Sequence, residues 1–90
     1  MDHQKLKNRI SKINPETLFA DGFDDCLVGY CRVKGRCLAM YDSVLIIEKL
    51  SKDMTEEEAE EFFCFNIEGS FMGDNTPIFH EFTFERKDQF

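Results

Sequence analysis

The chain has 90 residues, of which 42% are hydrophobic and 32% charged, and its formal net charge is −7 at neutral pH. We expect one small domain over 1–90, with a basic N-terminal helix over 1–14 and a polar tail over 85–90. The acidic balance disfavours direct binding to nucleic acid, because phosphate contacts require a basic surface. No apolar run reaches the roughly 18 residues of a transmembrane helix and no secretory signal is evident, so we expect an intracellular protein that does not bind membranes.

The first segment is basic and weakly amphipathic. Leu6, Ile10 and Ile13 recur at the spacing of one helix face, and lysines and an arginine lie between them. We expect a short helix docked on the domain; the alternative, a helix lying on a membrane surface, would require a bulkier apolar face. A further helical turn is expected to begin at Pro15.

Two apolar stretches, Cys26–Val33 and Arg36–Tyr41, flank the dipeptide Lys34-Gly35. This arrangement predicts a β-hairpin with a two-residue loop. Such a loop sets the register of the pair, so that Tyr30 lies opposite Ala39.

The clearest helix signal lies within residues 54–71. Thr55 and Glu58 have the spacing of a capping box, and three consecutive glutamates place negative charge at the positive end of the helix dipole. Gly69 is expected to end the helix in the left-handed conformation. We therefore predict a helix over 56–68.

The second half of this helix is aromatic. We expect it to be buried nearly all round, so that Phe62, Phe63 and Phe65 supply much of the core. The same helical stripe places Asn66 inward. A preceding helix over Val44–Lys52 should form an αα-hairpin with it. Val44–Ile47 could instead continue the preceding strand, but Asp42-Ser43 is a helix-start signal and favours the helix.

A third strand is predicted over Ile78–Phe84, where apolar and polar side chains alternate. We expect it to add antiparallel to the hairpin. The predicted fold class is α+β: a small antiparallel sheet, made of the hairpin and the C-terminal strand, packed against an αα-hairpin, with a short N-terminal helix.

The turn that precedes the hairpin is acidic. Asp21, Asp24 and Asp25 could suggest a divalent-metal loop, but the spacing and the bidentate glutamate of a calcium loop are missing. We expect a solvated turn without a metal. This turn and a second polar group form a secondary candidate surface, which comprises Asp21, Asp24, Asp25, Asn66, Asp74, Asn75 and Thr76.

Four cysteines are irregularly spaced along the chain: Cys26, Cys31, Cys37 and Cys64. Zinc motifs have short spacers between ligands, and the predicted register places Cys31 and Cys37 on opposite faces of the hairpin, so we expect reduced thiols without a metal. His3 and His80 belong to no recognisable catalytic motif. We therefore assign no catalytic residue, no metal and no cofactor.

The acidic face of the predicted helix is the candidate partner-binding surface. Residues 53–68 contain seven acids and no base, and the face consists of Asp53, Glu56, Glu57, Glu60 and Glu61. Two interpretations stay open: the solvated side of an amphipathic helix, or a surface that binds a basic partner or imitates nucleic-acid phosphates.

Two blocks of the chain, ADGFDDCLVGY over Ala20–Tyr30 and a longer one over Tyr41–Phe79, resemble a family of small tailed-bacteriophage proteins of unassigned function. The motifs that carry the resemblance are D-G-F-D-D, Y-D, M-T-E-E-E-A-E-E-F-F with F-N-I, and G-D-N-T-P-I-F. The family more often has G-E-N-T-P at the last motif. This chain also differs in its cysteines and in its basic N-terminal extension.

The resemblance implies a phage origin and action in the host cytoplasm, and it implies no reaction. We expect a non-catalytic binding protein, acting in counter-defence or host takeover, whose partner is a host or defence-system protein with a basic surface. The alternatives are a nucleic-acid mimic that inhibits a DNA- or RNA-binding host protein, and a small-ligand binder or enzyme that uses Asn66, Asp74, Asn75 and Thr76 beside an aromatic pocket.

Overall fold

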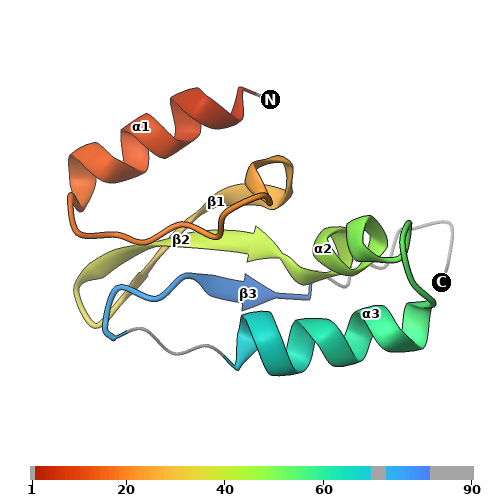
Figure 1. Cartoon of the computed structure of the whole chain (residues 1–90). Coiled ribbons are helices and arrows are strands. Elements are labelled where there is room, and N and C mark those ends of the chain that lie inside the picture. The colour runs from red at the N-terminus through yellow and green to blue at the C-terminus, as the bar shows by residue number, and fades with distance from the viewer. Residues whose placement is uncertain (1, 70–72, 82–90) are drawn as a thin grey trace, which may run out of the picture.

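The computed structural model describes residues 2–69 and 73–81. It is an α+β fold with a three-stranded sheet, a helix pair and a short N-terminal helix, which confirms the predicted class (Figure 1). The elements follow in the order α1 (His3–Ile13), η1 (Asp24–Cys26), β1 (Leu27–Val33), β2 (Arg36–Asp42), α2 (Ser43–Leu50), α3 (Glu56–Phe62), η2 (Phe63–Glu68) and β3 (Ile78–His80). η1 is a 3₁₀ turn and η2 is a π-helix.

The predicted hairpin and its register are confirmed. β1 and β2 pair antiparallel, with Tyr30 opposite Ala39, and an irregularity after Leu27 adds one residue to β1. Lys34 and Gly35 form the connecting turn with φ values of 50° and 82°. Both central residues of a type I′ turn need positive φ, and that turn matches the twist of the flanking strands, so Lys34-Gly35 determines which residues face each other.

The third strand is parallel to its neighbour, which corrects the prediction of an antiparallel sheet. The strand order is β1-β2-β3, and Tyr41 of β2 lies opposite Phe79 of β3. Between the two strands the chain passes through α2, α3 and η2, and a helical crossover of this kind allows β3 to run in the same direction as β2. The sheet is therefore mixed. The expected strand residues 82–84 and the expected tail over 85–90 lie outside the described residues.

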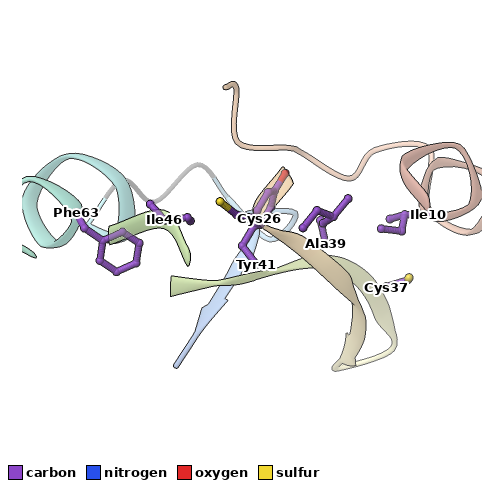
Figure 2. Close-up of a cluster of buried hydrophobic side chains, with 8 residues drawn as sticks. Ile10, Cys26, Cys37, Ala39, Tyr41, Ile46 and Phe63 are labelled. Carbon is purple, nitrogen blue, oxygen red and sulfur yellow. The ribbon is translucent and has the colours of Figure 1, made fainter. Parts of the chain in front are cut away.

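One buried cluster joins the two ends of the molecule. In Figure 2 it extends from Ile10 on α1, past Ala39 and Tyr41 of the central strand, to Phe63 on η2. The full set is Ile10, Cys26, Leu27, Cys37, Ala39, Tyr41, Ile46 and Phe63. β2 therefore carries the core, and the helices at both ends pack onto its side chains.

Tyr41 lies at the centre of this cluster and is fully buried. Its ring stacks on Phe79 with centroids 5.5 Å apart, and Phe63 meets Phe79 edge-on at 5.6 Å. The hydroxyl accepts a hydrogen bond of 2.8 Å from the Ala20 N–H. A buried hydroxyl needs such a partner, and this bond holds the segment after α1 against the sheet. Burial raises the pKa of Tyr41 to about 12.

α1 forms as predicted, with Asp2 as its N-cap. Ile10 is buried and Leu6 packs against the core, whereas Ile13, the last helical residue, is 46% exposed. The helical turn expected from Pro15 is instead a single hydrogen-bonded turn that ends at Thr17. The apolar face of α1 is thus shorter than its sequence pattern indicates.

α2 and α3 pack against each other as the predicted αα-hairpin. The capping box at the start of α3 is confirmed: Thr55 Oγ1 accepts from the Glu58 N–H at 3.2 Å, and Glu58 Oε1 accepts from the Thr55 N–H at 3.3 Å. α2 is capped by the Asp42 carboxylate, which accepts from the Val44 N–H at 2.9 Å, and it ends at Leu50.

The end of the long helix differs from the prediction. After Phe62 the chain continues as the π-helix η2, and Gly69 has φ −74°, so the expected left-handed stop was wrong. The Gly69 N–H donates to the Cys64 carbonyl, five residues earlier, at 3.0 Å. A Cβ at position 69 would lie 2.9 Å from that same oxygen. Glycine is therefore needed for close approach within the wide turn rather than for a left-handed φ.

Only one of the three phenylalanines expected in the core is buried. Phe63 is 3% exposed, whereas Phe62 is 41% and Phe65 80% exposed, and Asn66 also lies at the surface. The prediction assumed α-helical geometry throughout. The π turn that begins at Phe63 changes the angular positions of the residues after it, and it brings Ile67 against the core while Phe65 and Asn66 face solvent.

Candidate functional site

The five acids of the candidate surface lie on α3 and on the turn before it. All are exposed: Asp53, Glu56, Glu57, Glu60 and Glu61. Within residues 2–69 and 73–81 none of the five forms an ion pair. No described lysine, arginine or histidine therefore pairs with their negative charge, which is presented to solvent.

These acids do not form a single continuous face. Glu56 and Glu60 line a groove between α2 and α3, whereas Asp53 and Glu61 line a second hollow on α3. Glu57 lines neither of the two. The helix therefore offers two acidic concavities, and sequence reasoning had merged them into one surface.

The first concavity, which we call the acidic groove, has a volume of about 440 Å³. Carboxylates reach it from three separate parts of the fold, on α2, on α3 and just after β3, and apolar atoms of α2 also line it. No lysine, arginine or histidine of the described residues is among its lining. The lining residues are Val44, Ile47, Glu48, Ser51, Glu56, Glu60 and Glu81.

The second concavity, which we call the aromatic hollow, has a volume of about 540 Å³. It combines two exposed phenylalanine rings with three carboxylates. The lining residues are Asp53, Met54, Glu58, Glu61, Phe62, Phe65 and Asn66. The hollow thus has both an apolar and a negatively charged part.

The acidic turn before the hairpin has a structural role. The Lys7 ammonium lies 3.2 Å from both carboxylate oxygens of Asp24, and the Lys49 ammonium lies 2.9 Å from Asp25. The hydrogen bond from Lys49 holds the pKa of Asp25 below its usual value. Asp21 is exposed. Two of these three acids therefore tie the turn to α1 and α2.

The polar turn before β3 is also engaged in the fold. Asn75 Oδ1 accepts from Asn14 Nδ2 at 3.1 Å and from Arg36 Nη1 at 3.4 Å. Asp74 lies 3.9 Å from the Arg36 guanidinium, and the Thr76 hydroxyl donates to a carbonyl of the turn at 2.7 Å. The turn that carries the N-T-P motif thus links the end of α1 and β2 to the start of β3.

Asp74 and Thr76 line a further groove of about 610 Å³ beside the hairpin loop, whereas Asn66 belongs to the aromatic hollow. The structure therefore does not bring together the residues of the expected small-ligand pocket. The groove beside the loop is lined by Val33, Lys34, Arg36, Leu38, Gly73, Asp74, Thr76, Pro77 and Ile78.

The four cysteines are free thiols, and they occupy different environments. Cys26 and Cys37 are buried, and burial raises the pKa of both, that of Cys26 to about 11. The observed register places Cys31 and Cys37 on opposite faces of the hairpin. Cys64 is exposed on η2. Among the described residues, no three His, Cys, Asp or Glu side chains cluster closely enough to hold a metal ion.

Sequence reasoning missed three carboxylates of the two concavities. Glu48 and Glu81 reach the acidic groove from α2 and from the end of β3, and Glu58 lines the aromatic hollow in addition to capping α3. The spacing of Val44 and Glu48 by four residues places them on one side of α2, and this signal was available in the sequence. The position of Glu81 depends on the parallel pairing of β3, so no local pattern indicates it.

No family model, curated protein or solved structure matches the chain. The resemblance to small tailed-bacteriophage proteins therefore stays a prediction. Over the described part of the chain, every helix is too short or too polar to cross a membrane.

Proposed function

We propose that this chain is a non-catalytic binding protein that contacts a basic partner protein through the acidic surface of α3. One observation supports the proposal above the others: five exposed acids on and before α3 form no ion pair among the described residues. Elsewhere on the same molecule, Asp24 and Asp25 are paired with lysines. Other exposed acids of the described residues, such as Glu16 and Asp21, also form no ion pair, so what sets α3 apart is that these five lie within residues 53–61.

Within the described part of the chain, most carboxylates of α3 make no bond that stabilises the fold. Glu58 is the acid that completes the capping box, whereas Glu57 and Glu61 are exposed and bond to no described side chain. Like charges four residues apart on a helix are destabilising by roughly 0.2–0.5 kcal/mol per pair. A partner with lysines and arginines would relieve that repulsion and would associate faster because opposite charges attract at long range.

The resemblance to phage proteins suggests where this binding takes place. We propose action in the host cytoplasm, on a host or defence-system protein with a basic surface, in counter-defence or host takeover. A stricter version is mimicry of nucleic-acid phosphates. That version adds one requirement, which is that double-stranded DNA or RNA competes with this chain for the same surface of the partner.

A matched pair of charge reversals tests the proposal. The double variant Glu57→Lys/Glu61→Lys should weaken binding of a partner captured from bacterial lysate and slow its association, because it removes charge from the contact. The control Glu16→Lys/Asp21→Lys makes the same change in net charge at exposed positions away from α3 that form no ion pair among the described residues. Binding of all three proteins is measured over a range of salt concentrations.

The expected result is a wild-type affinity that falls with salt, a weak and nearly salt-independent affinity for the α3 variant, and a control close to wild type. Equal losses in the α3 variant and in the control would show that only net charge matters. If the α3 variant binds as tightly as wild type, its acids are only the solvated side of an amphipathic helix and are not the contact surface.

A further inference from the structure

The aromatic hollow exposes more apolar surface than the fold requires. Phe65 is 80% exposed, the largest exposed fraction among the large hydrophobic side chains of the described residues, and Phe62 beside it is 41% exposed. An isolated exposed apolar residue is ordinary, whereas here two aromatic rings lie close together. Aromatic side chains surrounded by polar residues are typical anchors of a protein interface.

We propose that Phe62 and Phe65 are the apolar anchors of the partner interface, and that they bind a basic amphipathic segment of the partner. Apolar side chains of that segment would cover the two rings, while its lysines or arginines pair with Asp53, Glu58 and Glu61 at the rim of the hollow. This inference rests on the proposed function and deepens it, because it names the partner's chemistry and the residues that hold it.

Both rings lie on the helical segment that α3 and η2 form. Phe62 ends α3 and Phe65 lies within η2, on either side of Phe63, which is 3% exposed and packs edge-on against Phe79. The bond from the Gly69 N–H to the Cys64 carbonyl is part of the wide turn that directs Phe65 outward. A ring held in place before binding loses less freedom on association than a ring on a flexible loop.

The surrounding charge identifies the occupant. A second copy of the chain would bring the same three carboxylates against one another, and each copy already carries a net charge of −7. Anionic lipid headgroups and nucleic-acid phosphates would be repelled in the same way. A basic segment with an apolar face meets both requirements, and it matches the usual interface pattern of aromatic anchors inside a charged rim.

Two synthetic helical peptides test this inference. The first carries leucines along one face and lysines along the other, and the second has serine in place of every leucine at the same charge. At physiological salt, Phe65→Ala should weaken binding of the leucine peptide by at least about tenfold, the scale of an interface anchor, and Phe62→Ala should act in the same direction. Neither change should alter the weak binding of the serine peptide.

Tyr30→Ala is the matched control, because Tyr30 is an exposed aromatic residue on β1, at 37% exposure, away from the hollow. It should leave binding of the leucine peptide unchanged. Thermal unfolding of Phe65→Ala should stay close to that of wild type, which separates a loss of binding from a loss of folding.

The outcomes separate this inference from the proposed function. If Phe65→Ala binds the leucine peptide as wild type does while Glu57→Lys/Glu61→Lys binds it weakly, the aromatic anchors are refuted and the acidic surface stands. If the leucine peptide fails to bind wild type, or binds all variants alike, both ideas fail. Sedimentation that shows self-association of wild type, lost in Phe65→Ala, would make a second copy the occupant and overturn the basic partner.

Discussion

The two charged helices of this protein, α1 and α3, lie at opposite ends of the molecule and use their charges differently (Figure 1). On α1, Lys7 pairs with Asp24 at 3.2 Å and its ammonium lies 5.0 Å from the centre of the Phe19 ring. Asn14, which caps the end of α1, donates to the Cys37 carbonyl at 2.8 Å. Polar groups of α1 therefore help to hold the helix on the domain.

Among the described residues, no side chain from another element bonds to the acids of α3. The buried residue of α3 is Ala59, and Phe63 continues that buried side into η2, while the acids and two aromatic rings point away from the core. The difference teaches that exposure of charge alone does not mark a binding surface. Lys5, Arg9 and Lys12 of α1 also form no ion pair among the described residues, so unpaired charge alone does not separate the two helices. What distinguishes α3 is a cluster of like charges next to two exposed phenylalanine rings.

The largest expected effect is on the free energy of unfolding, and it should differ between the buried and the exposed side of the helix formed by α3 and η2. Phe63→Ala should lower the free energy of unfolding by about 3–5 kcal/mol, because it removes a buried ring that packs on Phe79. Phe65→Ala should change it by no more than about 0.5 kcal/mol, because that ring is mostly in solvent. Urea unfolding of both variants measures the two values.

Equal effects for Phe63→Ala and Phe65→Ala would contradict the π-helical geometry of η2. A cost of several kcal/mol at Phe65 would place its ring in the core, as the sequence pattern had indicated. The aromatic hollow and the inference built on it would then be wrong together.

The sequence predicts those parts of the fold that local chemistry determines. Lys34-Gly35 sets the hairpin register through its positive φ values, and Thr55 with Glu58 sets the start of α3. The direction of β3 depends on where two packed helices return the chain, and no residue near β3 encodes that. The π turn after Phe62 also escaped prediction, because helical periodicity assumes a constant number of residues per turn.

The same division holds for the candidate site: its local features could be predicted from the sequence, and its tertiary features could not. The exposure of Glu57 and Glu61 follows from their positions opposite Ala59 on the helix, whereas Glu56 and Glu60 lie nearer the buried side and line the groove beside α2. The acidic groove was not predictable, because Glu48, Glu60 and Glu81 come together through tertiary packing and through the parallel pairing of β3. The aromatic hollow was not predictable either, because Phe65 faces solvent as a result of the π turn that begins at Phe63.

A second prediction concerns two titratable side chains of the buried core, Cys26 and Tyr41. Burial raises the pKa of Cys26 from its ordinary 9.0 to about 11 and that of Tyr41 from 10.0 to about 12. The folded state therefore favours the protonated forms, and their contribution to stability is complete below pH 9 and is lost as pH rises through these ranges. The urea midpoint should fall progressively above pH 9.

Cys26→Ala is the control for this alkaline loss. Its absolute stability will be lower, so the comparison is of slopes: the midpoint should fall less between pH 9 and 11 than in wild type. Part of the fall in the urea midpoint should persist in Cys26→Ala, because Tyr41 still titrates. The ion pair of Lys49, whose pKa is raised by Asp25, is also lost as pH rises, and this loss too lowers the midpoint. A midpoint that is flat from pH 9 to 11 in wild type would contradict the burial of both groups.

The smallest expected effect is on the free energy of unfolding when a single acid is neutralised, either Asp24 in the turn or Glu61 on α3. Asp24→Asn should lower the free energy of unfolding by about 0.2–1 kcal/mol, because it weakens a partly exposed ion pair with Lys7. Glu61→Gln should leave it unchanged within about 0.5 kcal/mol, or raise it slightly by relieving repulsion with Glu57. The loss in Asp24→Asn should shrink at high salt and disappear when Lys7 is already replaced by methionine, since no pair then remains to be broken. If Glu61→Gln cost as much as Asp24→Asn, the acids of α3 would contribute to folding as those of the turn do, and their exposure would no longer indicate a binding surface.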